Sequence, residues 1–68
     1  MPLTDAEELK LSAYFELYGI KPSRQERVRT IARMSREGHS IKEIYAEVKG
    51  NMGDLIEHMS KLRRWGVW

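Results

Sequence analysis

The sequence has no cysteine, and this absence excludes two common ways of stabilising a short chain. Disulfide bonds need pairs of cysteines, and zinc sites with thiolate ligands need cysteine as well. A chain of 68 residues without such supports depends on helix packing, helix capping or oligomerisation for its stability. A lack of cysteine also suits a reducing compartment.

Long apolar stretches are absent too, since the longest uninterrupted one has only two or three residues. A helix that spans a membrane needs about 20 predominantly apolar residues. The first five residues, Met1-Pro2-Leu3-Thr4-Asp5, have neither the basic start nor the apolar centre of a signal peptide. We therefore expect a cytoplasmic protein that has no contact with a membrane.

Neither sign of charge dominates the composition, because 12 Lys and Arg residues oppose 10 Asp and Glu residues and leave a net charge of +2. The charges are nevertheless unevenly placed. Residues 1–22 carry two basic and four acidic groups, a net charge of −2, whereas residues 23–68 carry ten basic and six acidic groups, a net charge of +4. A basic segment of this kind is typical of nucleic-acid binding, and it is also compatible with a simple solvated helix face.

Three capping boxes predict where helices begin. In each box a Ser or Thr stands three residues before a Glu, so that two backbone N–H groups at the helix start find acceptors. The pairs are Thr4 with Glu7, Ser23 with Glu26, and Ser40 with Glu43. A glycine suited to the left-handed backbone that ends many helices follows each box, at Gly19, Gly38 and Gly50.

The spacing of apolar residues between these signals predicts an all-α fold with four short helices, at residues 5–18, 24–37, 41–49 and 52–64. Asn51 is the expected N-cap of the last helix. Pro22 is expected to keep residues 20–22 in a loop, and residues 65–68 are expected to form an extended tail. The 68 residues make one domain, with an additional helix in residues 1–20 and a tri-helical core in residues 23–68.

The last part of the chain has the spacing of a known family. The matching positions are Ile31, Arg36-Glu37-Gly38, Ser40, Ile41, Ile44, Val48, Leu55, Met59, Leu62 and Trp65-Gly66-Val67. With these residues, the segment 25–67 resembles the helix-turn-helix core of winged-helix transcriptional regulators. The resemblance implies that the last three helices form a helix-turn-helix-like bundle and that residues 52–64 enter the major groove of DNA.

The resemblance and the charge pattern lead to a first hypothesis, a small sequence-specific regulator of transcription that binds double-stranded DNA as a homodimer. Arginine suits the geometry of phosphate groups, and three arginines form one stripe along the second helix. The candidates for phosphate contact are Arg29, Arg33, Arg36, Lys61, Arg63 and Arg64. The candidates for base contact are Asn51, Met52, Glu57 and Ser60.

A second hypothesis is a small protein-interaction module of the phage or mobile-element type, which binds a host regulator or a polymerase. Asp54 and Glu57 on the base-facing side are unfavourable near phosphates, and the wing is expected to be missing. The candidate interface residues are Tyr14, Tyr18, Trp65 and Trp68. Trp65 is expected to close the bundle against the first helix, whereas for Trp68 a core role and an interface role are equally open.

Residues with catalytic or metal-binding chemistry are few. His39 and His58 are the only histidines, and no Asp or Glu completes a familiar metal motif with them. Ser40 beside His39 is explained as a helix cap and not as a nucleophile with its base. We therefore expect no enzymatic activity, no cofactor and no metal site.

Overall fold

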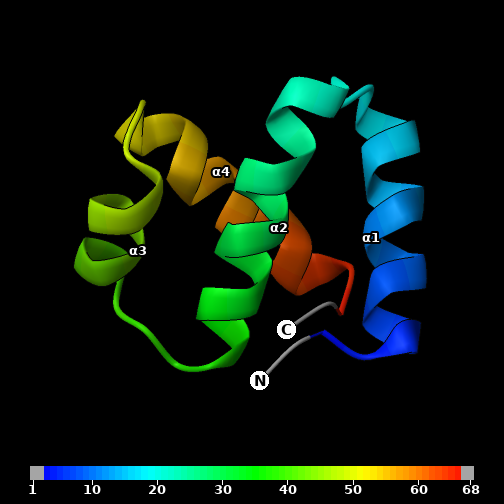
Figure 1. Ribbon diagram of the computed structural model, residues 1–68, viewed down its shortest axis with the longest axis horizontal. Coiled ribbons are helices and arrows are strands. Elements are labelled where there is room, and N and C mark those ends of the chain that lie inside the picture. Colours follow the sequence, from blue (N-terminus) through cyan, green and yellow to red (C-terminus); the bar gives the residue numbers. More distant parts are fainter. Residues whose placement is uncertain (1–2, 67–68) are drawn as a thin grey trace.

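The computed structural model describes residues 3–66, and in this range it contains four helices and no strand. The helices are α1 (Asp5–Tyr18), α2 (Pro22–Arg36), α3 (Ile41–Val48) and α4 (Met52–Arg64). α1 and α3 lie on opposite sides of the pair formed by α2 and α4 (Figure 1). The predicted all-α fold is therefore confirmed. No helix in this part of the chain has both the length and the apolar composition that crossing a membrane requires.

Two of the capping boxes form as predicted and fix the starts of α1 and α3. The N–H of Glu7 donates to Thr4 Oγ1 (3.2 Å), and the N–H of Thr4 donates to the Glu7 carboxylate (2.8 Å). Ser40 and Glu43 form the same two hydrogen bonds, at 3.2 and 2.9 Å. At the other end of α1, Gly19 has a left-handed backbone with φ 62°. Both ends of α1 thus lie at the residues that the sequence predicts.

The third capping box, predicted at Ser23, is wrong, because α2 begins at Pro22, two residues before the predicted start at Arg24. A proline suits the first position of a helix, since its ring fixes φ and its missing N–H would have no partner there. Lys21 therefore occupies the N-cap position without a side-chain cap, and Ser23 lies inside the helix. The loop between α1 and α2 is correspondingly shorter, at residues 19–21.

The end of α4 also differs from the prediction. Trp65 keeps a helical backbone (φ −80°, ψ −7°) and caps α4, so no extended tail begins there. The centroid of its indole ring lies 5.9 Å from that of Tyr14 and 6.4 Å from that of Tyr18. Trp65 thus closes the bundle against α1, as the sequence predicts. Trp68 lies outside the described residues.

The core lies where α2, α3 and α4 meet, and α1 covers one side of it. α2 contacts both α3 and α4, which also contact each other. The largest fully buried side chains are Leu11, Tyr14, Val28, Ile31, Ile44, Leu55 and Leu62. Burying an aliphatic side chain of this size contributes about 1.5–3 kcal/mol. This packing fixes the orientation of α3 and α4 and leaves their outer sides exposed.

The connection between α3 and α4 has three residues, 49–51, a length typical of a helix-turn-helix. Its backbone has a positive φ at Gly50 (83°) and also at Lys49 (55°), which is the only non-glycine residue with positive φ among residues 3–66. Arg27 of α2 holds this turn in place. Its guanidinium donates to the Lys49 carbonyl (2.8 Å) and to the Asp54 carboxylate (2.8 Å).

Candidate functional site

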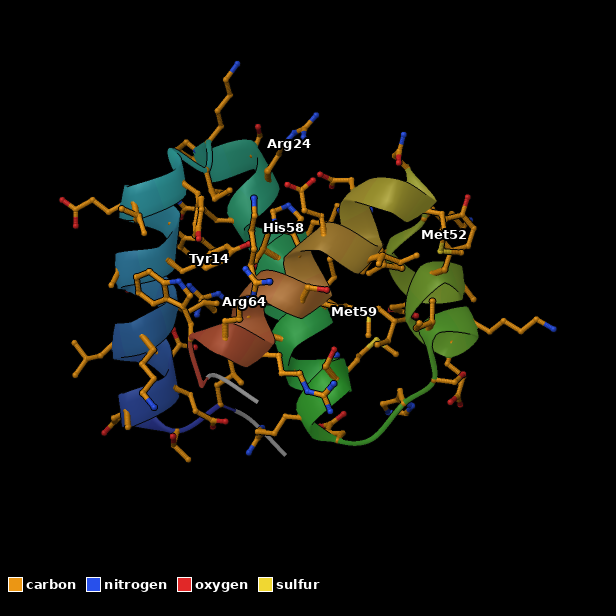
Figure 2. The ribbon with its side chains drawn as sticks, turned by 180° about the vertical axis from the view of Figure 1, so that it is seen from behind. Tyr14, Arg24, Met52, His58, Met59 and Arg64 are labelled. Carbon is orange, nitrogen blue, oxygen red and sulfur yellow. The ribbon has the colours of Figure 1, made fainter. Side chains whose placement is uncertain are left out.

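An apolar face lies on the outer side of α3 and α4. It consists of Ile41 from α3 together with Met52, Ile56 and Met59 from α4, and we refer to these four residues as the apolar face. Ile41, Met52 and Ile56 are 44%, 37% and 46% exposed, and Met59 is half-buried. Figure 2 shows Met52 and Met59 on the side of α4 that lies toward α3.

The spacing of residues along α4 explains why these side chains share one side of the helix. Met52, Ile56 and Met59 are separated by four and three residues, which places them above one another on a helix. A hollow of about 310 Å³ opens beside them, lined by Ile41, Ile56, Met59, Ser60 and Arg63. The hollow is mostly apolar and has a guanidinium at its border, so it suits an inserted apolar side chain.

Two of the polar residues predicted to face DNA bases, Asn51 and Glu57, have partners within the chain. The side chain of Asn51 accepts a hydrogen bond from the N–H of Asp54 (3.0 Å) and so caps α4, as predicted. Glu57 forms an ion pair with Lys61 (2.8 Å), and the hydrogen bond from Lys61 lowers the pKa of Glu57. The ammonium of Lys61 also lies 4.5 Å from the centroid of the Tyr18 ring. Three of the predicted DNA contacts are therefore engaged in internal contacts.

The three arginines of α2 that were predicted to contact phosphates, which we refer to as the arginine stripe, all pair with glutamates. Arg29 pairs with Glu8 and Arg36 with Glu7 (3.4 Å), and both glutamates belong to α1. Arg33 pairs with Glu37 one turn further along the chain (3.1 Å). The hydrogen bond with Glu8 raises the pKa of Arg29, whose guanidinium also lies 5.8 Å from the Phe15 ring centroid.

The structure does not bring the predicted DNA-binding residues together on one surface. Arg29 and Arg36 of the arginine stripe pair with α1, whereas the apolar face lies where α3 and α4 meet, and α1 and α3 are on opposite sides of the molecule (Figure 1). Arg63 and Arg64 are exposed at the end of α4.

The predicted aromatic interface residues belong mainly to the core. Tyr14 is fully buried, so it supports the packing of α1 and is not exposed to a partner. Its ring centroid lies 4.8 Å from that of Tyr18, which is 41% exposed. Together with Trp65, these rings form the contact between α1 and the end of α4.

A chain of polar contacts that the sequence did not predict links α1 to the α3–α4 turn. The hydroxyl of Tyr14 lies 2.6 Å from His58 Nδ1, and His58 Nε2 lies 3.5 Å from Asp54 Oδ1. Asp54 in turn accepts a hydrogen bond from Arg27, which also binds the Lys49 carbonyl. Figure 2 shows Tyr14 and His58 side by side between α1 and α4.

The environment of this buried pair sets its protonation. Burial raises the pKa of Tyr14, so its hydroxyl keeps its proton at neutral pH. Burial also lowers the pKa of His58 from its ordinary value of 6.5, and the charge of Asp54 opposes this effect only in part. His58 is therefore neutral at neutral pH, with Tyr14 donating to Nδ1 and Nε2 carrying its proton toward Asp54.

A second, larger hollow of about 690 Å³ opens at the start of α4. Its charged lining comes from Arg24 and Arg27 on one side and Asp54 and Glu57 on the other. Because both signs of charge are present, this hollow favours neither an anion nor a cation. Within residues 3–66, no group of three or more His, Cys, Asp or Glu side chains is arranged to hold a metal ion.

Comparisons of the chain with models of protein families, with curated proteins and with solved structures found no match. The apolar face brings together three exposed large apolar side chains of the tri-helical core, Ile41, Met52 and Ile56, beside a hollow.

Proposed function

We propose that this protein is a small protein-interaction module and that the apolar face is its binding surface. The observation that supports this proposal is the gathering of exposed apolar side chains beside a hollow on α3 and α4. Burying such side chains at an interface is favourable, and pockets that receive an apolar side chain are typical of the residues that dominate binding energy. Met52 and Met59 add flexible side chains that adapt to the shape of a partner.

The chemistry around the hollow indicates the kind of partner. Arg63 borders the hollow and Arg64 is the next residue of α4, so the C-terminal end of this helix is basic. The complementary ligand is an amphipathic helix of another protein, with apolar residues on one side and a carboxylate next to them. A regulator or polymerase subunit that carries such a helix is the partner class that we propose.

The proposal is tested with three baits: the wild-type protein, Ile56→Ser and Leu17→Ser. Leu17 is the matched control, because it is an exposed aliphatic residue (65%) on α1, away from the apolar face. We expect a protein in a lysate of the source cells to bind the wild type and Leu17→Ser and to be lost with Ile56→Ser. Recovery of the same proteins with all three baits, or of none with the wild type, would overturn the proposal.

Self-association is the other way in which the apolar face is covered, and it corresponds to the predicted homodimer. Light scattering during size-exclusion chromatography separates the two cases. We expect a monomer for the wild type. If the wild type is a dimer and Ile56→Ser is a monomer, the apolar face binds a second copy of the chain and not a different protein. The absence of cysteine supports our further proposal that the protein works in the cytoplasm.

DNA binding through the helix-turn-helix is the second candidate function. It is favoured by the three-residue connection between α3 and α4 and by the basic end of α4. Fluorescence anisotropy with duplex DNA over a series of salt concentrations tests it, because binding to phosphates weakens steeply as salt rises. Affinity for duplex DNA that falls steeply with salt would favour this function, whereas a flat response at low salt would exclude it.

A further inference from the structure

Two glutamates of α1 form ion pairs with two arginines of α2. Glu8 binds Arg29, and Glu7 binds Arg36 at 3.4 Å. The side chains of Glu7 and Arg36 are only 16% and 22% exposed, so this pair is largely shielded from water. Elsewhere on α1, Asp5 and Glu16 are exposed. Of the acidic residues of α1, Glu7 and Glu8 are therefore the two that pair with guanidinium groups of α2.

The placement of α1 matches the uneven charge of the sequence. Residues 1–22 have a net charge of −2 and residues 23–68 a net charge of +4, and the acidic segment lies against the arginine stripe of the basic one. A carboxylate and a phosphate present similar oxygens to a guanidinium, which binds both in the same planar geometry. The glutamates thus occupy positions that phosphate oxygens would otherwise take.

We propose that Glu7 and Glu8 mask two guanidinium groups of the arginine stripe, Arg36 and Arg29, and that loss of the two carboxylate charges opens a phosphate-binding surface on this stripe to the backbone of nucleic acid. The surface is separate from the apolar face, so it adds a second binding site to the proposed function and does not depend on it. The side chains of Arg29 and Glu8 are 34% and 40% exposed, and an ion pair in contact with water is weak, so phosphate groups compete for the Arg29 guanidinium once Glu8 is neutral.

The experiment compares two double variants that change the net charge equally. Glu7→Gln with Glu8→Gln removes the masking carboxylates, whereas Glu16→Gln with Glu47→Gln removes two exposed ones that have no ion pair within residues 3–66. Binding of a fluorescent DNA duplex is followed by anisotropy between about 50 and 200 mM salt. A difference between the variants therefore reports the position of the lost charges and not their number.

We expect the masking-site variant to bind the duplex more tightly and with a stronger dependence on salt. Two additional phosphate contacts make the slope of log K against log salt steeper by about 1.8, which is an additional loss of about twelvefold between 50 and 200 mM. Adding Arg29→Gln to this variant is expected to remove about half of the extra slope.

Equal binding by the two double variants, or no binding by the masking-site variant at the lowest salt, would overturn the proposal. Circular dichroism checks that each variant folds. If the half-buried Glu7 proves essential for folding, Glu8→Gln is compared with Glu16→Gln, and the expected difference in slope is about 0.9. Identical slopes for these single variants would contradict the proposal equally.

Discussion

Replacing Tyr14 by phenylalanine tests the buried contact that joins α1 to α4. The substitution keeps the aromatic ring, and with it the packing against Tyr18 and Trp65, but removes the hydroxyl that donates to His58. His58 is itself buried, so its Nδ1 loses its partner without gaining access to water. Leaving a buried acceptor unpaired costs about 1–3 kcal/mol. Against a total stability of about 3–10 kcal/mol for 68 residues, this is a large fraction.

Urea unfolding followed by circular dichroism measures this loss. With a slope of about 1 kcal/mol per molar urea, which is typical of small proteins, the midpoint is expected to fall by about 1–3 M. Tyr18→Phe is the matched control, because it removes the same group from a ring that is 41% exposed. We expect its midpoint to change by less than about 0.5 M, as for other surface substitutions.

The same contact predicts a dependence of stability on pH. Burial lowers the pKa of His58 in the folded protein below its ordinary value of 6.5, so the unfolded chain binds the proton more readily. The contribution of neutral His58 to the free energy of unfolding is therefore complete above pH 6.5. It is lost as the pH falls from 6.5 through the lower pKa of His58 in the folded protein. In Tyr14→Phe the neutral form of His58 loses its hydrogen-bond donor. Because this bond favours the neutral form, the pKa of His58 is expected to rise toward its ordinary value.

Nuclear magnetic resonance of the His58 ring protons measures this pKa in both proteins. Two results would refute the reasoning. One is a wild-type His58 that titrates at or above 6.5, and the other is an equal loss of stability in Tyr14→Phe and Tyr18→Phe.

Four further substitutions test other parts of the account. Ser40→Ala removes a formed cap and is expected to cost about 1 kcal/mol, whereas Ser23→Ala, inside α2, is expected to cost less than about 0.5 kcal/mol; thermal unfolding compares them. Gly50→Ala places a Cβ in a left-handed residue (φ 83°), 3.2 Å from the guanidinium of Arg27, and is expected to cost about 1–2 kcal/mol in urea unfolding. Ile56→Ser, on an exposed residue, is expected to change stability by less than about 1 kcal/mol, and a larger loss in the same assay would place Ile56 in the core.

Local signals in the sequence predicted most of the fold. Thr4 and Ser40 begin their helices as expected because each has its capping partner three residues later and no competing signal nearby. Ser23 has the same pattern, but Pro22 precedes it and takes the first helical position instead. The error in α2 therefore arose where two start signals overlapped and the proline determined the helix start.

The candidate surfaces were less predictable because they depend on contacts between distant parts of the chain. The periodicity of α2 places its arginines on one stripe, but it does not show that α1 lies against that stripe with Glu7 and Glu8. The opposite charges of the two segments were the available signal. Tyr14 and His58 are 44 residues apart, and nothing in the local sequence around either residue indicates their contact.

The affinity of a purified partner for the wild type and for two matched variants tests the central claim most directly. If the apolar face is the binding surface, Ile56→Ser removes a side chain that borders the hollow, whereas Leu17→Ser alters an exposed residue on α1. Loss of a dominant interface residue costs about 2 kcal/mol or more, so Ile56→Ser is expected to weaken binding about thirtyfold. Leu17→Ser is expected to change the Kd by less than about twofold. A partner whose Kd is unchanged by Ile56→Ser, or is weakened more by Leu17→Ser, would contradict the account.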